Sequence, residues 1–267
     1  MELVKTTLTP RVRMPKRDSI RALPLVLLAI VVLAATVAPA PAVAQGADGF
    51  LFRSPTITVS LRGGYAVPSA GSEIYDFVQE QLTVEKRDFN SGTLAGEVAV
   101  QVSERVDIAF GLGFSRSVKR SEFRDWVGDD DLPIEQSTEL SRIPITASAK
   151  VYLADRGRSV SRLAWIPARW APYVGVGGGI VSYDFEQFGE FVDFETFGIF
   201  QDRLISSGKS GTAHVMAGAD LSLNPRFLLT AEGRYSWASA NMSDDFSGFD
   251  SMDLSGFQAT AGFAVRF

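Results

Sequence analysis

The chain has 267 residues, of which 46% are apolar, 24 are glycine, 19 are phenylalanine and none is cysteine. This composition fits one or two ordinary folded units and excludes the disordered, collagen-like and disulfide-rich classes of protein. Without cysteine and with a single histidine, the chain has no thiol nucleophile, no thiolate zinc site and no multi-histidine metal site. Much enzyme chemistry is therefore excluded.

Residues 1–44 have the pattern of a secretory signal peptide. Six basic residues precede an apolar run, and a stretch of small residues ends at Ala44. A permanent membrane helix needs roughly 20 apolar residues, and two prolines bracket a shorter run here. We therefore expect export, cleavage after Ala44, and a mature domain over 45–267.

The mature chain is acidic. Removing the leader leaves 20 basic and 29 acidic residues, a net charge of −9. Binding nucleic acid by phosphate neutralisation needs the opposite sign. The charge therefore excludes nucleic acid as a partner.

From Gln45 onward the hydrophobic period is two residues, and no segment sustains a helical period. Every second residue from Val106 to Phe114 is large and apolar, with small or polar residues between. In a strand, this pattern gives one apolar and one polar face. The same alternation predicts eight strands near 56–67, 94–102, 106–115, 140–153, 172–185, 212–223, 227–237 and 256–267. Such strands, about 10 to 14 residues long, suffice to cross a bilayer at a tilt.

The connections between these strands alternate in length, as in a membrane barrel with long loops on one side and short turns on the other. About 25 residues join the first two strands, whereas tight turns follow at 103–105 and 224–226. The fourth-to-fifth connection, Ala154 to Ala171, is long where a short turn is expected. The pattern offers no account of its length.

Alternation alone also fits a soluble β-sandwich, so the charged face decides the environment. An eight-stranded cylinder is just wide enough for side chains to fill its interior, and closure avoids unpaired amides in hydrocarbon. We therefore predict an all-β, antiparallel, up-and-down transmembrane barrel with its apolar face toward lipid. The predicted structural network of the lumen is Arg62, Glu97, Asp107, Arg142, Lys150, His214, Asp220, Glu232 and Arg234, with Arg266 on the same face.

The chain resembles the small eight-stranded outer-membrane barrels of Gram-negative bacteria, of the OmpX and OmpA transmembrane-domain type. The resemblance spans 54–267 and rests on the segments IPITASAKVYL, PYVGVGGG and LLTAEGRY and on the aromatic last strand. It implies that this last strand is the address read by the barrel-assembly machinery. The residues that would carry this role are Phe257, Phe263, Val265 and Phe267.

Two sequence features could suggest a nucleotide-binding site or a catalytic site. The glycines of 175–179 lack the third glycine of a dinucleotide loop, since Ile180 takes its place, and strand-like sequence follows. His214 invites comparison with lipid A deacylases, but Met216 stands where that family has serine, and no Ser, His and acid trio can be named. We therefore expect no cofactor and no catalysis, with His214 as a hydrogen-bonding group of the lumen.

The four predicted outer loops are strongly acidic. Residues 68–92, 117–139, 184–211 and 238–253 hold 22 acids and 7 bases. Acidic loops are usually solvated, although carboxylate clusters at Asp129-Asp130-Asp131 and Asp244-Asp245 would suit divalent cations. The loops also hold aromatic residues that would contact partners or pack together above the barrel: Tyr75, Phe77, Trp126, Phe188, Phe191, Phe194, Phe197 and Phe200.

The long connection Ala154 to Ala171 is rich in arginine and should face the periplasm. Its arginines would meet anionic lipid headgroups and its tryptophans the membrane interface. The residues concerned are Arg156, Arg158, Arg162, Arg169, Trp165 and Trp170.

These patterns together predict a monomeric outer-membrane barrel with a structural and cell-surface contact role. Its expected partners are outer-membrane lipid and lipopolysaccharide, the barrel-assembly machinery and a surface ligand of unknown identity. A narrow porin-like channel for small solutes is the first alternative, since lumen charges also suit a conduction path. A lipid A-modifying enzyme is the second.

Overall fold

The computed structural model describes residues 49–267 except 129–130, 162–163, 194–195, 197 and 247. The expected signal peptide lies outside the described residues. Eight antiparallel strands close into a ring in the order β1-β2-β3-β4-β7-β8-β9-β11, since β11 pairs with β1 and β8 with β9. The strands of this ring are β1 (Ile57–Pro68), β2 (Ser91–Ser103), β3 (Val106–Val127), β4 (Pro133–Tyr152), β7 (Trp170–Val192), β8 (Ile199–Ser222), β9 (Phe227–Ala240) and β11 (Gly256–Arg266). The predicted eight-stranded antiparallel barrel is confirmed.

The outer wall of the ring is apolar because large apolar side chains alternate with inward-facing residues along the barrel strands. Leu61 is 54% exposed, whereas its neighbour Arg62 is 3% exposed. The other exposed large apolar side chains of the wall include Tyr65, Leu94, Val100, Phe110, Ile145, Val151, Val176, Ile180, Val215, Phe227, Trp237, Phe257 and Phe263. An apolar surface this extensive is an aggregation liability in water.

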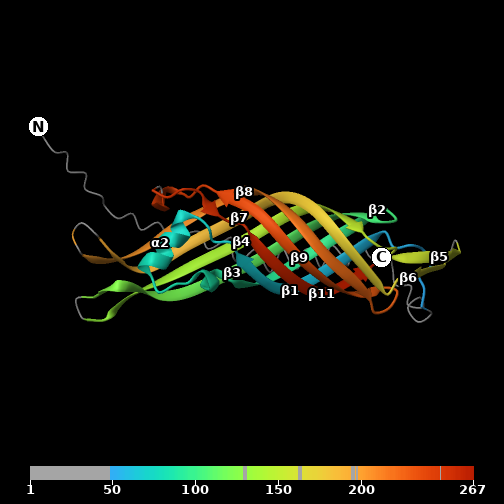
Figure 1. Ribbon diagram of the computed structural model, residues 1–267, viewed down its shortest axis with the longest axis horizontal. Helices are drawn as coiled ribbons and strands as arrows, with labels where there is room; N and C mark the ends of the chain where they lie inside the picture. The colour runs from blue at the N-terminus through green and yellow to red at the C-terminus, as the bar shows by residue number, and fades with distance from the viewer. Residues whose placement is uncertain (1–48, 129–130, 162–163, 194–195, 197, 247) are drawn as a thin grey trace, which may run out of the picture. The chain divides into compact units, whose positions relative to one another are not determined.

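Four strands are longer than the sequence pattern indicates. β3, β4, β7 and β8 have 20 to 24 residues, whereas the other four have 11 to 14. The expected loops at 117–139 and 184–211 are therefore mostly strand. The outward residues of these segments are largely polar, so the apolar alternation does not continue into them. Figure 1 shows the resulting hairpins projecting from one end of the barrel.

The projecting hairpins form a four-stranded sheet, here called the extension, that consists of 116–127, 133–141, 184–192 and 199–210. Its inner face packs on the connection between β1 and β2, which contains α2 (Glu73–Gln81) and the 3-10 turn η1 (Lys86–Phe89). The connection between β9 and β11, with η2 (Asp244–Phe246) and β10 (Met252–Asp253), completes this core. Figure 1 places α2 beside the extension.

The helix α2 corrects the expectation that no helix forms. Its apolar residues Ile74, Tyr75 and Val78 are buried and lie on one helical face. Nine residues hold too few repeats of this spacing for the sequence pattern to stand out. No helix in the described part of the chain is long and apolar enough to cross a membrane.

The opposite end of the barrel carries the tight turns and a small hairpin. The long connection after β4 folds into β5 (Gly157–Ser161) and β6 (Ala164–Pro167), which pair with each other. Leu51 bridges to Trp165 through two 2.8 Å backbone hydrogen bonds. This hairpin accounts for the unexpected length of the connection.

Candidate functional site

The middle of the lumen is filled by a central charge cluster, formed by Arg62, Glu97, Lys150, Glu232 and Arg234. Arg62 Nη2 lies 3.2 Å from Glu97 Oε2 and 3.3 Å from Glu232 Oε1. Lys150 Nζ contacts Glu97 and lies 3.3 Å from Glu232 Oε2. Arg234 Nη2 lies 3.0 Å from Glu232 Oε1. Each carboxylate is therefore shared by at least two cations, as buried charge requires.

Tyr173 also contacts the central charge cluster. The Tyr173 hydroxyl donates to Glu232 Oε2 at 2.9 Å, and Lys150 Nζ lies 4.6 Å from the centre of its ring. Gly218 makes room for this ring, because a Cβ there would lie 2.6 Å from the Tyr173 hydroxyl oxygen. Tyr173 is not among the predicted lumen residues. Its register partner on β4 is Tyr152, which lies two residues after Lys150 and also faces inward.

His214 lies in the lumen and is 2% exposed. Its Nε2 is 2.8 Å from Ser148 Oγ, while its Nδ1 has no hydrogen-bond partner among the described residues. Gly177 accommodates the imidazole, since a Cβ there would lie 2.6 Å from Nε2. The glycines of 175–179 thus belong to the middle of a strand. A Ser–His pair without a carboxylate on Nδ1 lacks the group that orients the base in a hydrolytic triad.

A second polar group fills the end of the lumen near the β5–β6 hairpin. Arg156 Nη1 lies 2.7 Å from Asp107 Oδ2, and its guanidinium lies 4.6 Å from the centre of the Tyr152 ring. The Tyr152 hydroxyl donates to Asp220 Oδ2 at 3.0 Å. The expectation that Arg156 reaches lipid headgroups is wrong, because the hairpin turns its side chain back toward Asp107.

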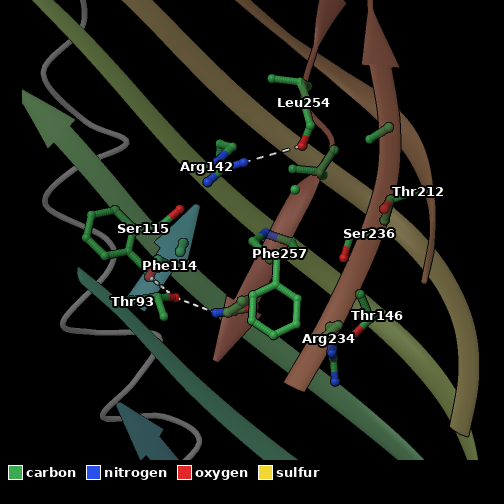
Figure 2. A pocket seen from close by; sticks show the side chains of 16 residues that line it. Thr93, Phe114, Ser115, Arg142, Thr146, Thr212, Arg234, Ser236, Leu254 and Phe257 are labelled. Atoms are coloured by element: carbon green, nitrogen blue, oxygen red, sulfur yellow. Dashed lines mark hydrogen bonds between the residues drawn. The ribbon is translucent and has the colours of Figure 1, made fainter. Parts of the chain in front are cut away.

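A small cavity of about 70 Å³ lies between the central charge cluster and the extension. Figure 2 shows Arg142 on its upper side, where Nη1 donates to the Leu254 carbonyl at 3.3 Å. Arg234 and Thr146 lie on the lower side. Arg142 is therefore in the lumen but separate from the central charge cluster.

The aromatic residues of the outer connections divide into two groups. Tyr75 is fully buried against Phe89, with 4.9 Å between ring centres, and this burial raises the pKa of Tyr75. Phe188 and Phe200, in contrast, are about half exposed on the extension. Tyr75 therefore packs within the outer connections, the second of its two expected roles, whereas Phe188 and Phe200 are accessible for contacts. Phe194 and Phe197 lie outside the described residues.

The residues of the arginine-rich connection, Ala154 to Ala171, also fall into a buried group and an exposed group. Trp165 is 6% exposed and packs under Arg266, whose guanidinium lies 5.5 Å from the centre of its ring, so its expected place at the membrane interface is wrong. Trp170 is 57% exposed. Arg158 and Arg169 are exposed, and Arg162 lies outside the described residues.

The residues of the expected assembly signal lie on β11 and just after it. Phe257, Phe263 and Phe267 are exposed on the outer wall, and Val265 is partly buried. The backbone of β11 closes the ring, pairing Phe263 with Leu61 and Phe257 with Val67. Recognition by an assembly machinery stays a prediction.

The acidic connections were candidates for cation binding. In the described part of the chain, no three acidic or histidine side chains gather closely enough to hold a metal ion. Asp129 and Asp130 lie outside the described residues, and Asp245 accepts a hydrogen bond from the backbone nitrogen of Ile205 at 2.9 Å. Cation binding stays a prediction.

No known family profile matches the sequence, and no curated protein matches it. Among solved structures, the chain is similar to small outer-membrane β-barrel proteins. Neisserial surface protein A is 14% identical, with a TM-score of 0.44, over 84% of this chain and 100% of that one. OprG of Pseudomonas aeruginosa is 13% identical, with a TM-score of 0.44, over 81% and 99%. Ail, the attachment invasion locus protein of Yersinia pestis, is 13% identical, with a TM-score of 0.35, over 78% and 99%.

Proposed function

We propose that the mature protein is a bacterial outer-membrane barrel whose extension makes contacts at the cell surface. The shorter strands, of 11 to 14 residues, match a tilted bilayer crossing, and their exposed wall is apolar. The longer strands add about ten residues, or roughly 30 Å at the usual rise per residue. A barrel that served only to cross the membrane would not need this addition.

The single observation that carries the proposal is the packed core of the extension. Ile74, Val78, Ile134 and Phe185 are at most 1% exposed, so the projecting sheet is a built platform rather than a set of loose loops. Its surface displays Val127, Leu132, Phe188 and Phe200 at 47–61% exposure. Exposed apolar side chains on a rigid platform suit protein or glycan contacts.

The test compares attachment of cells that display the protein with cells that do not. Phe188→Ser should lower attachment to a surface or to other cells without reducing the amount of folded barrel in the membrane. Val160→Ser, at an exposed apolar site on β5, is the control and should leave attachment unchanged. Equal attachment with and without the protein would contradict the proposal.

The proposed role includes a closed lumen. The central charge cluster and the core of the extension both obstruct the axis, and the two cavities that border the cluster measure about 70 and 20 Å³. The alternative of a narrow channel draws support from the same charges, which would attract small ions if the cluster opened. Planar-bilayer recording separates the two, since large, stable openings would favour the channel.

The enzyme alternative is disfavoured by the burial of His214. Ser148 and His214 both lie inside the wall, whereas acyl chains of lipid meet its outer face. We propose a non-enzymatic protein without a cofactor, acting as a monomer in contact with outer-membrane lipid and lipopolysaccharide.

A further inference from the structure

A polar pocket lies at the end of the barrel opposite the extension. Its volume is about 440 Å³, and it opens between the β5–β6 hairpin and the ends of the barrel strands. The residues of its wall that matter here are Arg156, Arg158, Arg266, Trp165, Glu104 and Asp155. Figure 1 shows the hairpin at this end, near the C-terminus.

Arg266 is the unusual group in this wall. It is 4% exposed, and its Nη1 donates to Ser222 Oγ at 3.0 Å. Its Nη2 has no hydrogen-bond partner among the described residues. Because an unsatisfied buried donor of a charged group is costly, an acceptor that reaches this nitrogen from the pocket would be bound favourably.

Among the residues that line the pocket, arginines outnumber carboxylates by three to two. Asp155 is held by Arg105 at 2.7 Å, on the exposed side of the connection. Arg156 is engaged by Asp107. Arg158 is exposed and forms no ion pair with the described residues, so it and Arg266 face the pocket against Glu104.

We infer that this pocket binds a phosphate group, held between Arg266 and Arg158 against the indole of Trp165. A guanidinium offers two parallel N–H donors that match phosphate oxygens. The phosphate group would belong to a lipid headgroup of the inner leaflet or to a free phosphate. Both sources present the same phosphate oxygens to the guanidinium groups. This site does not depend on the contacts made by the extension at the other end.

The test follows Trp165 by fluorine NMR. Full-length mature protein in maltoside micelles, with 5-fluorotryptophan at its four tryptophans, should give four resonances, of which Trp165→Phe identifies one. One titration adds inorganic phosphate against chloride at equal ionic strength. A second adds lysophosphatidylglycerol against a monoacylglycerol, which lacks the phosphate group.

The Trp165 resonance should shift saturably with phosphate, with lysophosphatidylglycerol, or with both, and the arm that responds identifies the source. Arg158→Gln should weaken binding about tenfold or more, as expected for a lost charge-assisted contact. Arg266→Lys keeps the charge but loses the forked geometry, so it should weaken binding even if Arg266→Gln fails to fold. Arg120→Gln, an exposed arginine of β3 on the extension, is the matched control and should bind as wild type.

Three results would overturn the inference. They are no shift in either arm, an equal shift with chloride or monoacylglycerol, and binding in Arg158→Gln and Arg266→Lys equal to that of wild type.

Discussion

Arg62 and Glu232 lie 3.3 Å apart inside the barrel, although β11 separates their strands in the ring and 170 residues separate them in the chain. The contact is possible only because the sheet closes and directs both side chains inward. It ties β1 to β9 through the lumen, independently of the backbone ladder. The central charge cluster is therefore a cross-brace of the cylinder.

Removing one cation from this cluster should destabilise the barrel. Lys150→Met leaves Glu97 and Glu232 with fewer buried partners, and breaking a buried pair in this way costs about 3–5 kcal/mol. Urea titration of the barrel folded into lipid vesicles, followed by gel mobility, measures the loss. The double variant Glu97→Gln with Lys150→Met should recover part of it; a double variant less stable than the single one would refute the bracing role.

Replacing His214 should leave lipid A unchanged. His214→Ala removes a hydrogen bond to Ser148 inside the wall and no group that reaches acyl chains. Mass spectrometry of lipid A from cells expressing each variant should give identical acylation, with Ser148→Ala as a companion. If expression of the wild type changed the mass of lipid A and neither variant did so, the protein would be an enzyme instead.

Truncating the helix should loosen the extension and spare the barrel. Ile74→Ala and Val78→Ala delete side chains that are at most 1% exposed, and losing a buried isoleucine side chain costs about 2–5 kcal/mol. Because the helix belongs to the outer core, we expect faster protease cleavage within 69–90 at unchanged heat-modifiable gel mobility. Phe77→Ala, at a partly exposed position of the same helix, is the control. If the variants also lost the heat-modifiable gel mobility, the extension and the barrel would unfold as one unit.

The connection between β1 and β2 should loosen in acid. The Asp88 carboxylate accepts the backbone N–H of Glu85 at 2.9 Å and lies 3.1 Å from Lys119 Nζ, and these contacts lower the pKa of Asp88. Since the folded pKa lies below the unfolded value of about 3.9, the contribution is complete above that value and is lost as pH falls through the folded pKa. Hydrogen exchange of 85–90 from pH 6 to pH 3 should show this loss in wild type. Asp88→Asn should exchange fast throughout; a pH response that persists in Asp88→Asn would assign it to another group.

Much of the barrel was predictable from the chain alone. Apolar residues of the outer wall and polar residues of the lumen alternate with period two, so the faces of Leu61 and Arg62 follow from the sequence without knowledge of their partners. The same parity predicted the five charged residues of the central charge cluster. The all-β class, the ring of eight strands and the inward face are therefore properties of local sequence.

Only the tertiary structure decided which charges meet and how far the strands extend. The pairing of Arg62 with Glu232 depends on the stagger of eight strands around a closed ring, which no local window contains. Arg156 reaches Asp107 because a hairpin outside the ring folds back, and Tyr75 is buried because two distant connections pack on the extension. In the extension, the outward residues of the strands are largely polar, so apolar alternation no longer separates strand from loop.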